Sequence, residues 1–259
     1  AGTSGATGPA GATGPAGATG PAGTSGASGS TGPTRAGLGF RPTSAASIAA
    51  GKPQTDQTQL GQPQTGFALE LLGDTPAVVF PDGRRVPLSL RRAEILALLD
   101  SRRRGWSAME LAYEVYGETG AASTIRIEMH RIRAAASGLV ESNPYRLTDA
   151  AHGTSDASRV VRSMRNGQLA EALDAYSAPL LSRSAAFAIE SLRVELSDAV
   201  GTAVRASGSA ELIKRWCATD MGSTDERAVH VLGRLLGPRD AGYLSFRARS
   251  ERLDREFGL

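Results

Sequence analysis

The hydrophobic and polar positions divide this chain into two unequal parts, and the change lies near residue 67. Residues 1–66 are poor in large apolar side chains and consist mainly of Gly, Ala, Thr, Ser, Pro and Gln. From Phe67 onward, apolar residues recur at the spacings of short strands and amphipathic helices. The packed part of the protein is therefore predicted to lie within residues 67–259, which is ample for two small domains.

Glycine occupies every third position from Gly2 to Gly32, and residues 1–34 contain no Asp, Glu, Lys or Arg. This is the collagen pattern, in which only glycine fits near the axis of a triple helix. A flexible tether is the alternative interpretation, and the sequence leaves both open. Residues 35–66 are polar and lack a repeat, so they bury too little apolar surface to offset the entropy of ordering. We predict a collagen-like low-complexity tract over 1–34 and a disordered linker over 35–66.

Short strands are predicted at the start of the packed part. Residues 67–72, 77–80 and 84–88 have the length and composition of strands. The tripeptide Pro81-Asp82-Gly83 between the second and third is a strong turn signal. This pattern predicts a small antiparallel sheet that contains a tight hairpin.

Two helices with recognisable N-terminal signals are predicted next. Ser89 stands at an N-cap position before an apolar helical stripe over residues 90–100. Ser107 and Glu110 match a capping box, and the helix that they open is predicted to end at Gly117. Trp106, directly before the capping box, is interpreted as a core residue that covers the junction of the two helices rather than as a ligand-stacking group.

A third helix is predicted to open at residue 122 or 123 and to run through Ala136. Residues 139–141 and 145–147 then flank Ser142-Asn143-Pro144 as a second hairpin. Strands, three helices and a terminal hairpin are the element order of a winged helix, with a helix-turn-helix over 107–136 and the hairpin 139–147 as the wing.

Everything after residue 150 is predicted to be helical. The expected helices cover residues 155–166, 169–176, 185–206, 209–218, 224–236 and 241–256. The predicted fold class is thus mainly α, with a winged-helix domain over 67–149 and a helical bundle over 150–259 that serves as an activator or interaction domain.

The third helix has one apolar face and two polar ones. The apolar stripe contains Ile125, Met129, Ile132 and Ala136, at spacings of four, three and four. Two polar rows contain Thr124, Glu128 and Arg131, and Arg126, His130 and Arg133. A helix of this kind fits the major groove of DNA, where arginine makes paired hydrogen bonds to guanine. An amphipathic surface helix whose arginines reflect codon bias is the alternative interpretation.

Residues 89–149 resemble the winged-helix effector domain of OmpR-type response regulators. They are more similar still to the version in actinobacterial regulators, including antibiotic regulatory proteins and some GAF-domain-containing regulators. The resemblance rests on Leu90–Leu99, Ser107–Ala112, Val115–Gly117, Thr124–Arg133 and Pro144–Leu147. It extends more loosely into residues 155–206, which resemble the helical activator domain that follows the winged helix in the antibiotic regulatory proteins.

The resemblance implies a transcription regulator that binds double-stranded DNA. It places base contacts at Arg126, Glu128 and Arg131 and phosphate contacts at Thr124, His130 and Arg133. It places Arg146, in the wing, at a minor groove. Glu128 either accepts from a cytosine amino group or pairs with Arg131 or Arg126 in the free protein. The Ser-Asn-Pro wing turn departs from the glycine-containing turn of the family, which puts the reach of the wing in doubt.

The resemblance also implies partners beyond DNA. RNA polymerase, an upstream GAF-like sensor and a second copy of the chain, as a homodimer on DNA, are the expected candidates. The phosphorylatable receiver domain of the OmpR-type regulators has no counterpart in this sequence. Control is therefore expected to come from an upstream portion or from the helical region.

Charge adds little to this interpretation. The chain has a formal net charge of +3, but residues 67–149 contain eleven arginines and eleven acidic residues and are therefore neutral. Only two lysines accompany 27 arginines, which is typical of a GC-rich genome and weakens any argument from arginine enrichment. A DNA-binding face must therefore arise from local clustering of arginines.

The remaining residues favour no other chemistry. The single cysteine, Cys217, excludes an internal disulfide and a cysteine-based zinc site, and we expect it to be a packing residue. His152 and His230 lack partners at metal-ligand spacing and are expected to be exposed. We therefore expect no metal, no cofactor and no enzymatic activity. No apolar run approaches the roughly 20 residues that span a membrane, so a cytoplasmic location is expected.

Two functions from other classes remain as alternatives. The first is a collagen-like structural or adhesive protein with helical modules attached. The second is a protein-interaction module in which the winged helix is a scaffold that does not bind DNA.

Overall fold

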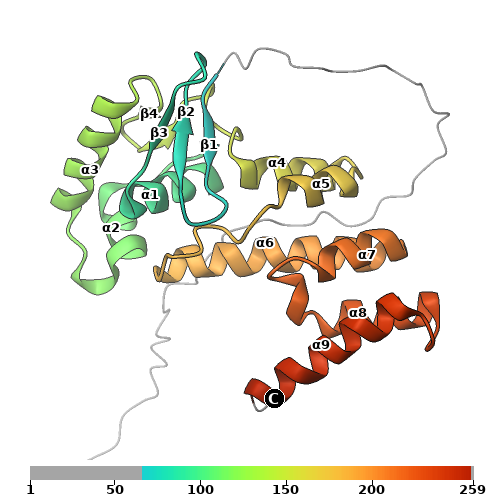
Figure 1. Cartoon of the computed structure of the whole chain (residues 1–259). Helices are drawn as coiled ribbons and strands as arrows, with labels where there is room; N and C mark the ends of the chain where they lie inside the picture. The colour runs from blue at the N-terminus through green and yellow to red at the C-terminus, as the bar shows by residue number, and fades with distance from the viewer. Residues whose placement is uncertain (1–65, 258–259) are drawn as a thin grey trace, which may run out of the picture. The chain divides into compact units, whose positions relative to one another are not determined.

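The computed structural model describes residues 66–257 (Figure 1). The tract predicted over 1–34 and nearly all of the linker predicted over 35–66 lie outside the described residues. The N-terminal elements are β1 (Ala68–Glu70), β2 (Ala77–Val79), β3 (Arg85–Pro87), α1 (Leu90–Ser101), α2 (Ala108–Tyr116), α3 (Ala122–Ala135), β4 (Val140–Glu141) and β5 (Arg146–Leu147). The elements that follow are α4 (Asp156–Arg165), α5 (Leu169–Ala175), α6 (Phe187–Ala206), α7 (Ala210–Cys217), α8 (Glu226–Leu236) and α9 (Ala241–Phe257). This order confirms the predicted fold class: a small antiparallel sheet, three helices and a β-hairpin precede an all-helical region.

The first sheet is antiparallel in the order β1-β2-β3, and Val78 lies between Leu69 and Val86. Its β2–β3 turn is the predicted one at residues 81–83. Gly83 there has a φ of +83°, in the left-handed region that glycine enters without strain. The predicted hairpin is therefore confirmed.

The two predicted N-caps have different outcomes. The Ser107 hydroxyl accepts a hydrogen bond from the Glu110 N–H at 3.2 Å, and the Glu110 carboxylate accepts from the Ser107 N–H at 2.7 Å, which confirms the capping box. The hydrogen bond from the Ser107 backbone N–H is the main reason that the pKa of Glu110 lies below its usual value. Ser89 occupies the N-cap position of α1, but its side chain makes no capping hydrogen bond, so its expected capping role is wrong.

This difference gives a stability prediction with a matched control. Ser107→Ala removes a hydrogen bond to an otherwise unsatisfied N–H, and we expect the free energy of unfolding to fall by about 1 kcal/mol. Ser89→Ala removes no such bond and is expected to change it by less than about 0.5 kcal/mol. Urea unfolding of both variants measures the two values. Equal losses would contradict the assigned capping geometry.

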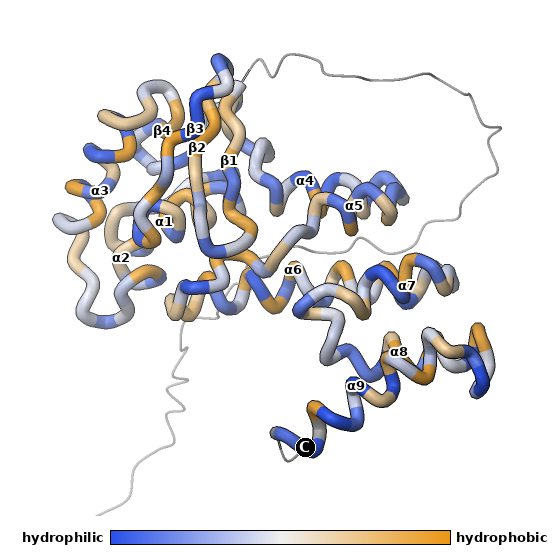
Figure 2. Tube along the Cα trace, in the orientation of Figure 1, coloured by the Kyte–Doolittle hydropathy of each residue, from blue (hydrophilic) through white to orange (hydrophobic). Residues whose placement is uncertain are grey.

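The core of the N-terminal part lies where α1, α2 and α3 meet. Ile125, Met129 and Ile132 of α3 are buried, as the apolar stripe predicts. Figure 2 shows hydrophobic and hydrophilic residues alternating along this helix. Trp106 is also buried, and its indole N–H donates to the Leu98 carbonyl at 2.7 Å. The core role expected of Trp106 is confirmed.

The all-helical region follows the predicted sequence of helices closely. Side-chain oxygens cap four of its helices at their N-termini: Ser155 for α4, Ser209 for α7, Asp225 for α8 and Asp240 for α9. Each of these residue types is a strong N-cap, so the starts of these helices are set locally. None of the helices within residues 66–257 is both long enough and apolar enough to cross a lipid bilayer.

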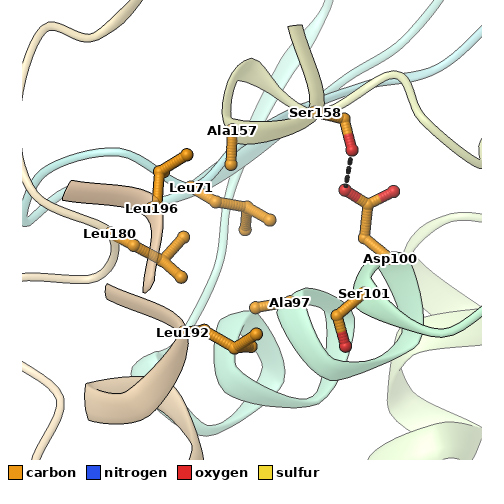
Figure 3. A pocket seen from close by; sticks show the side chains of 9 residues that line it. All are labelled: Leu71, Ala97, Asp100, Ser101, Ala157, Ser158, Leu180, Leu192 and Leu196. Atoms are coloured by element: carbon orange, nitrogen blue, oxygen red, sulfur yellow. Dashed lines mark hydrogen bonds between the residues drawn. The ribbon is translucent and has the colours of Figure 1, made fainter. Parts of the chain in front are cut away.

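Asp100, near the end of α1, ties the N-terminal part to the helical region. Its carboxylate accepts hydrogen bonds from the Gly153 N–H at 2.9 Å, from the Ser155 hydroxyl at 2.5 Å and from the Ser158 hydroxyl at 2.7 Å. Figure 3 shows this carboxylate beside a cavity of about 20 Å³ whose other walls are mostly leucine and alanine. That volume has room for one water molecule.

Two more buried carboxylates cross the same junction. Asp156 accepts from the N–H groups of Leu71 and Leu72, each at 2.9 Å, although burial raises the pKa of this carboxyl above its usual value. Glu94 of α1 is fully buried and accepts from the Ser184 hydroxyl at 2.7 Å. Apolar packing is also continuous across the junction, in one cluster that runs from Leu69 in β1 to Leu232 in α8. The regions predicted over 67–149 and 150–259 therefore share one hydrophobic core.

Candidate nucleic-acid interface

The turn between α2 and α3 brings the two helices close together. A short 3-10 helix at Gly117–Thr119 follows α2, and Gly120 leads into α3. A Cβ atom at Gly120 would lie 2.2 Å from the Ala112 carbonyl oxygen, so only glycine allows this approach. The result is a helix-turn-helix in which α2 holds α3 at the surface.

The outer face of α3 presents most of the predicted contact residues to solvent. Thr124, Arg126, His130 and Arg131 are exposed, and Glu128 and Arg133 are half-buried. Ile127 lies among them and is 53% exposed, although it is a large apolar residue. The structure therefore brings the six predicted α3 residues together on the side of the helix that does not pack on the core.

Three members of this face have no side-chain partner within residues 66–257. The side chains of Thr124, Arg126 and His130 make no ion pair or hydrogen bond with any residue of that range. An arginine without a partner keeps all of its N–H donors available for another molecule. Arg126 is thus the most available cation on α3.

Glu128, by contrast, is held by two arginines. Its carboxylate lies 3.1 Å from Nε of Arg92 on α1 and 2.6 Å from a guanidinium nitrogen of Arg131. Its side chain is only 13% exposed. Of the two alternatives that the sequence left open, pairing with Arg131 is the arrangement found in the free protein. Arg92 lies 36 residues away in sequence, and no local pattern indicated this contact.

The hairpin formed by β4 and β5 lies against the end of α3. Arg133 donates to the Ser142 hydroxyl at 2.7 Å, and its guanidinium lies 5.6 Å from the centre of the Tyr145 ring. Arg146, the predicted minor-groove residue, is exposed and pairs with Glu141 across the hairpin at 2.6 Å. The structure thus places Arg146 on the hairpin that Arg133 of α3 contacts, paired with a carboxylate that no sequence pattern indicated.

The turn of this hairpin is docked onto the loop between α1 and α2. The backbones of Tyr145 and Trp106 exchange two hydrogen bonds, at 2.8 and 2.9 Å. Gly105 faces the turn so closely that a Cβ atom there would lie 2.7 Å from the Tyr145 carbonyl oxygen and 2.9 Å from Pro144. These contacts give the atypical Ser-Asn-Pro turn a physical role, because they fix the hairpin against the helices.

The two histidines outside α3 differ from each other. His230 is exposed, as expected. His152 is half-buried, and its Nε2 atom is buried without a hydrogen-bond partner, so its expected exposure is wrong. The reason is local, because the His152 N–H bonds to the Thr148 carbonyl at 2.9 Å in a turn that folds back onto the protein.

Cys217 is buried beside the core, as the packing interpretation requires. Burial raises the pKa of its thiol to about 11, so the reactive thiolate is scarce at neutral pH. We expect alkylation by iodoacetamide at pH 8 to be at least about a hundredfold slower in the folded protein than in urea. Mass spectrometry of the time course checks this. Equal rates in the two conditions would show that the thiol is accessible.

This chain is similar to a curated protein and to a solved structure. The chain is 32% identical over 219 residues to an uncharacterized 47.3 kDa protein of Rhodococcus erythropolis, encoded in the 5′ region of thcA. The match covers 83% of this chain, and the chain spans half the length of that protein. No family model matches.

Among solved structures, the chain is similar to Mycobacterium tuberculosis EmbR in complex with a low-affinity phosphopeptide. The identity is 18%, the TM-score is 0.38, and the match covers 73% of this chain and 65% of that one. At this distance the likeness carries no conclusion about the function of this chain.

Proposed function

We propose that this protein is a transcription regulator that binds double-stranded DNA sequence-specifically through α3. The observation that carries the proposal is the division of α3 into two faces. Its apolar stripe is buried in the core, while Arg126, His130 and Arg131 remain exposed on the opposite side. A rigidly anchored helix with an exposed cationic face suits the major groove, which admits one α-helix.

Each α3 residue has a distinct role in this proposal. Arg126 reads a base, because a guanidinium without a partner can bond to guanine O6 and N7 together. Thr124, His130 and Arg133 contact phosphate oxygens, which fixes the register of the helix on the duplex. Glu128 has its carboxylate occupied by Arg92 and Arg131, so we propose that it positions Arg131 toward a base instead of reading one itself.

The hairpin is proposed to act as a wing. Arg146 would enter a minor groove, where the negative potential attracts arginine. This requires its guanidinium to exchange Glu141 for the DNA, because the two side chains are paired in the free protein. The wing is short and docked onto Gly105, so we expect Arg146 to add less to the affinity than the residues of α3 do.

The finer assignment also belongs to the proposal. Residues 67–149 resemble OmpR-type regulators of the actinobacterial kind, and we propose membership of that group, action in the cytoplasm and binding as a homodimer. The helical region would then contact RNA polymerase or an upstream sensor. The shared core and the buried carboxylates at the junction support this, because a partner bound to α4–α9 would be rigidly connected to α1.

Selection from a pool of random duplexes tests the proposed function. The whole chain should enrich one motif, and its binding constant for that motif should fall steeply with salt, by about 0.9 log units per log unit of salt for each phosphate contact. Fluorescence anisotropy between 50 and 300 mM salt measures that slope. A pool without enrichment, together with binding that does not respond to salt, would refute DNA binding.

A further inference from the structure

A groove of about 430 Å³ lies between the start of β1 and the helix α4. The groove is lined by Gly66, Phe67, Ala68, Ala150, Gly153, Thr154, Arg159 and Arg162. Most of its lining residues are apolar or are glycines that present only backbone atoms. Its charged side chains, Arg159 and Arg162, both belong to α4. We refer to it below as the α4 groove.

The charge of the α4 groove is entirely positive. Its lining includes two arginines and no carboxylate. Arg159 and Arg162 are exposed, lie three residues apart on one face of α4, and form no ion pair within residues 66–257. Asp156, one turn earlier on α4, interacts electrostatically with Arg159, and its half-buried carboxylate also accepts from the N–H groups of Leu71 and Leu72. Its single negative charge leaves the two arginines with a net positive charge.

The two arginines are almost free of other contacts as well. Arg162 makes one long hydrogen bond to the Gly153 carbonyl, at 3.4 Å, and no side-chain hydrogen bond of Arg159 is present within the described range. Exposed arginines elsewhere on the protein, such as Arg85 and Arg146, are paired with carboxylates. The α4 groove therefore has two guanidinium groups available for an anionic partner.

The α4 groove reaches the segment that joins α3 to the wing. The ring of Phe67, on the groove floor, lies 4.0 Å from where a Cβ atom would stand at Gly138, just beyond the end of α3. Thr148, the residue directly after β5, donates its hydroxyl to the Gly138 carbonyl at 2.9 Å. Ala150, on the groove wall, follows two residues later. The groove thus begins where α3 and the wing end.

We propose that the α4 groove binds the phosphate backbone of DNA that flanks the segment read by α3. The charge is complementary, because guanidinium groups make paired hydrogen bonds to phosphate oxygens. The position of the groove beside the segment that joins α3 to the wing supports the same occupant, because a duplex that lies on α3 and the wing extends beyond them on both sides. The inference rests on the proposed function, and it assigns to α4 a contact that adds affinity without adding sequence information.

Binding measurements on two duplexes distinguish the proposed contact of the α4 groove from the contacts of α3. Both contain the selected motif, one without flanks and the other with about ten flanking base pairs on each side. Fluorescence anisotropy against salt is measured for the wild type, for the double variant Arg159→Ala with Arg162→Ala, and for Arg165→Ala. Arg165 is a matched control, because it is exposed on the same helix but does not line the groove.

For the flanked duplex, the double variant is expected to bind about tenfold more weakly, and its salt slope should be smaller by about 2. Its binding to the duplex without flanks should stay unchanged, and Arg165→Ala should match the wild type on both. Circular dichroism and urea midpoints verify the fold. Arg159→Ala alone serves as a second test, because that side chain has no hydrogen bond or ion pair within residues 66–257, and it should lower the slope by about 1.

Three results would overturn the inference in distinguishable ways. If the wild type binds DNA with a salt-dependent affinity that the double variant retains on the flanked duplex, the groove contact is wrong and the proposed function stands. An equal loss on both duplexes would also overturn the flanking assignment. If the wild type shows no salt-dependent DNA binding at all, the inference and the proposed function fail together.

Discussion

Replacing Asp100 by alanine is expected to lower the free energy of unfolding by about 3 kcal/mol. The Asp100 side chain is largely buried, and its carboxylate accepts hydrogen bonds from Gly153, Ser155 and Ser158. Alanine leaves these donors without a partner at a site where water has little access. The cost is therefore that of desolvated donors as well as of the lost bonds.

The same variant tests whether the two regions unfold together. Trp106 lies in the N-terminal part and Trp216 in α7, and the chain has no other tryptophan. Replacing either one by phenylalanine leaves a single fluorescent reporter for one region. In urea, we expect Asp100→Ala to shift both reporters to the same lower midpoint, because the core is shared.

Asp149→Ala is the control for this experiment. Asp149 pairs with Arg103 at 3.0 Å, but its side chain is 92% exposed, and we expect a change of less than about 0.5 kcal/mol. Two separate transitions for the two reporters would contradict a shared core. So would a loss after Asp100→Ala that is no larger than the loss after Asp149→Ala.

Replacing Arg126 by alanine is expected to weaken binding to the selected duplex by about 1–3 kcal/mol, or about 5- to 150-fold. Lysine at the same position keeps the charge but loses the planar fork that bonds to guanine O6 and N7. Arg126→Lys should therefore retain the salt slope of the wild type while its preference for the selected motif over a scrambled one falls.

Arg227 provides a matched control for Arg126. It is exposed at the start of α8, remote in sequence from α3, and Arg227→Ala should leave both affinity and preference unchanged. If Arg126→Lys keeps the full preference for the motif, Arg126 contacts phosphate and the base-reading role belongs elsewhere on α3. If Arg126→Ala binds like the wild type, the residue does not contact DNA.

The elements of the fold could be predicted because their signals are local. The apolar stripe of α3 repeats every three to four residues, and Ser107, Ser155 and Ser209 each cap a helix through an N–H only three residues away. The hairpin at 81–83 depends on one turn. A local signal failed at Ser89, where the residue type and position suit a cap but the side chain makes no capping bond.

The contacts between distant residues could not be predicted in this way. The Asp100–Ser155, Glu94–Ser184 and Glu128–Arg92 pairs span 55, 90 and 36 residues. No periodicity connects positions so far apart, and each pair exists only because the whole core has formed. For this reason no sequence pattern indicated that buried apolar residues on both sides of the predicted boundary at residue 149 pack in one core.

In the candidate site, too, the features that depend on local sequence could be predicted and the contacts between side chains could not. The exposed row on α3 could be predicted, since the buried stripe determines which side remains outside. The partners of Glu128, Arg133 and Arg146 could not, and these pairings decide which cations are available. They leave Arg126 available and pair Glu128 with Arg92 and Arg131 in the free protein, while the base contact expected of Glu128 stays a prediction.

Hydrogen exchange of the whole chain, with and without the selected duplex, tests most directly whether α3 is the DNA-binding element. Mass spectrometry of peptic fragments reports the exchange of backbone amides in each segment. We expect slower exchange in the duplex complex over residues 121–136 and 140–147, and no change over α8. Slower exchange confined to the α7–α9 segments, or unchanged exchange over α3 at saturating duplex, would show that α3 is not the DNA-binding element.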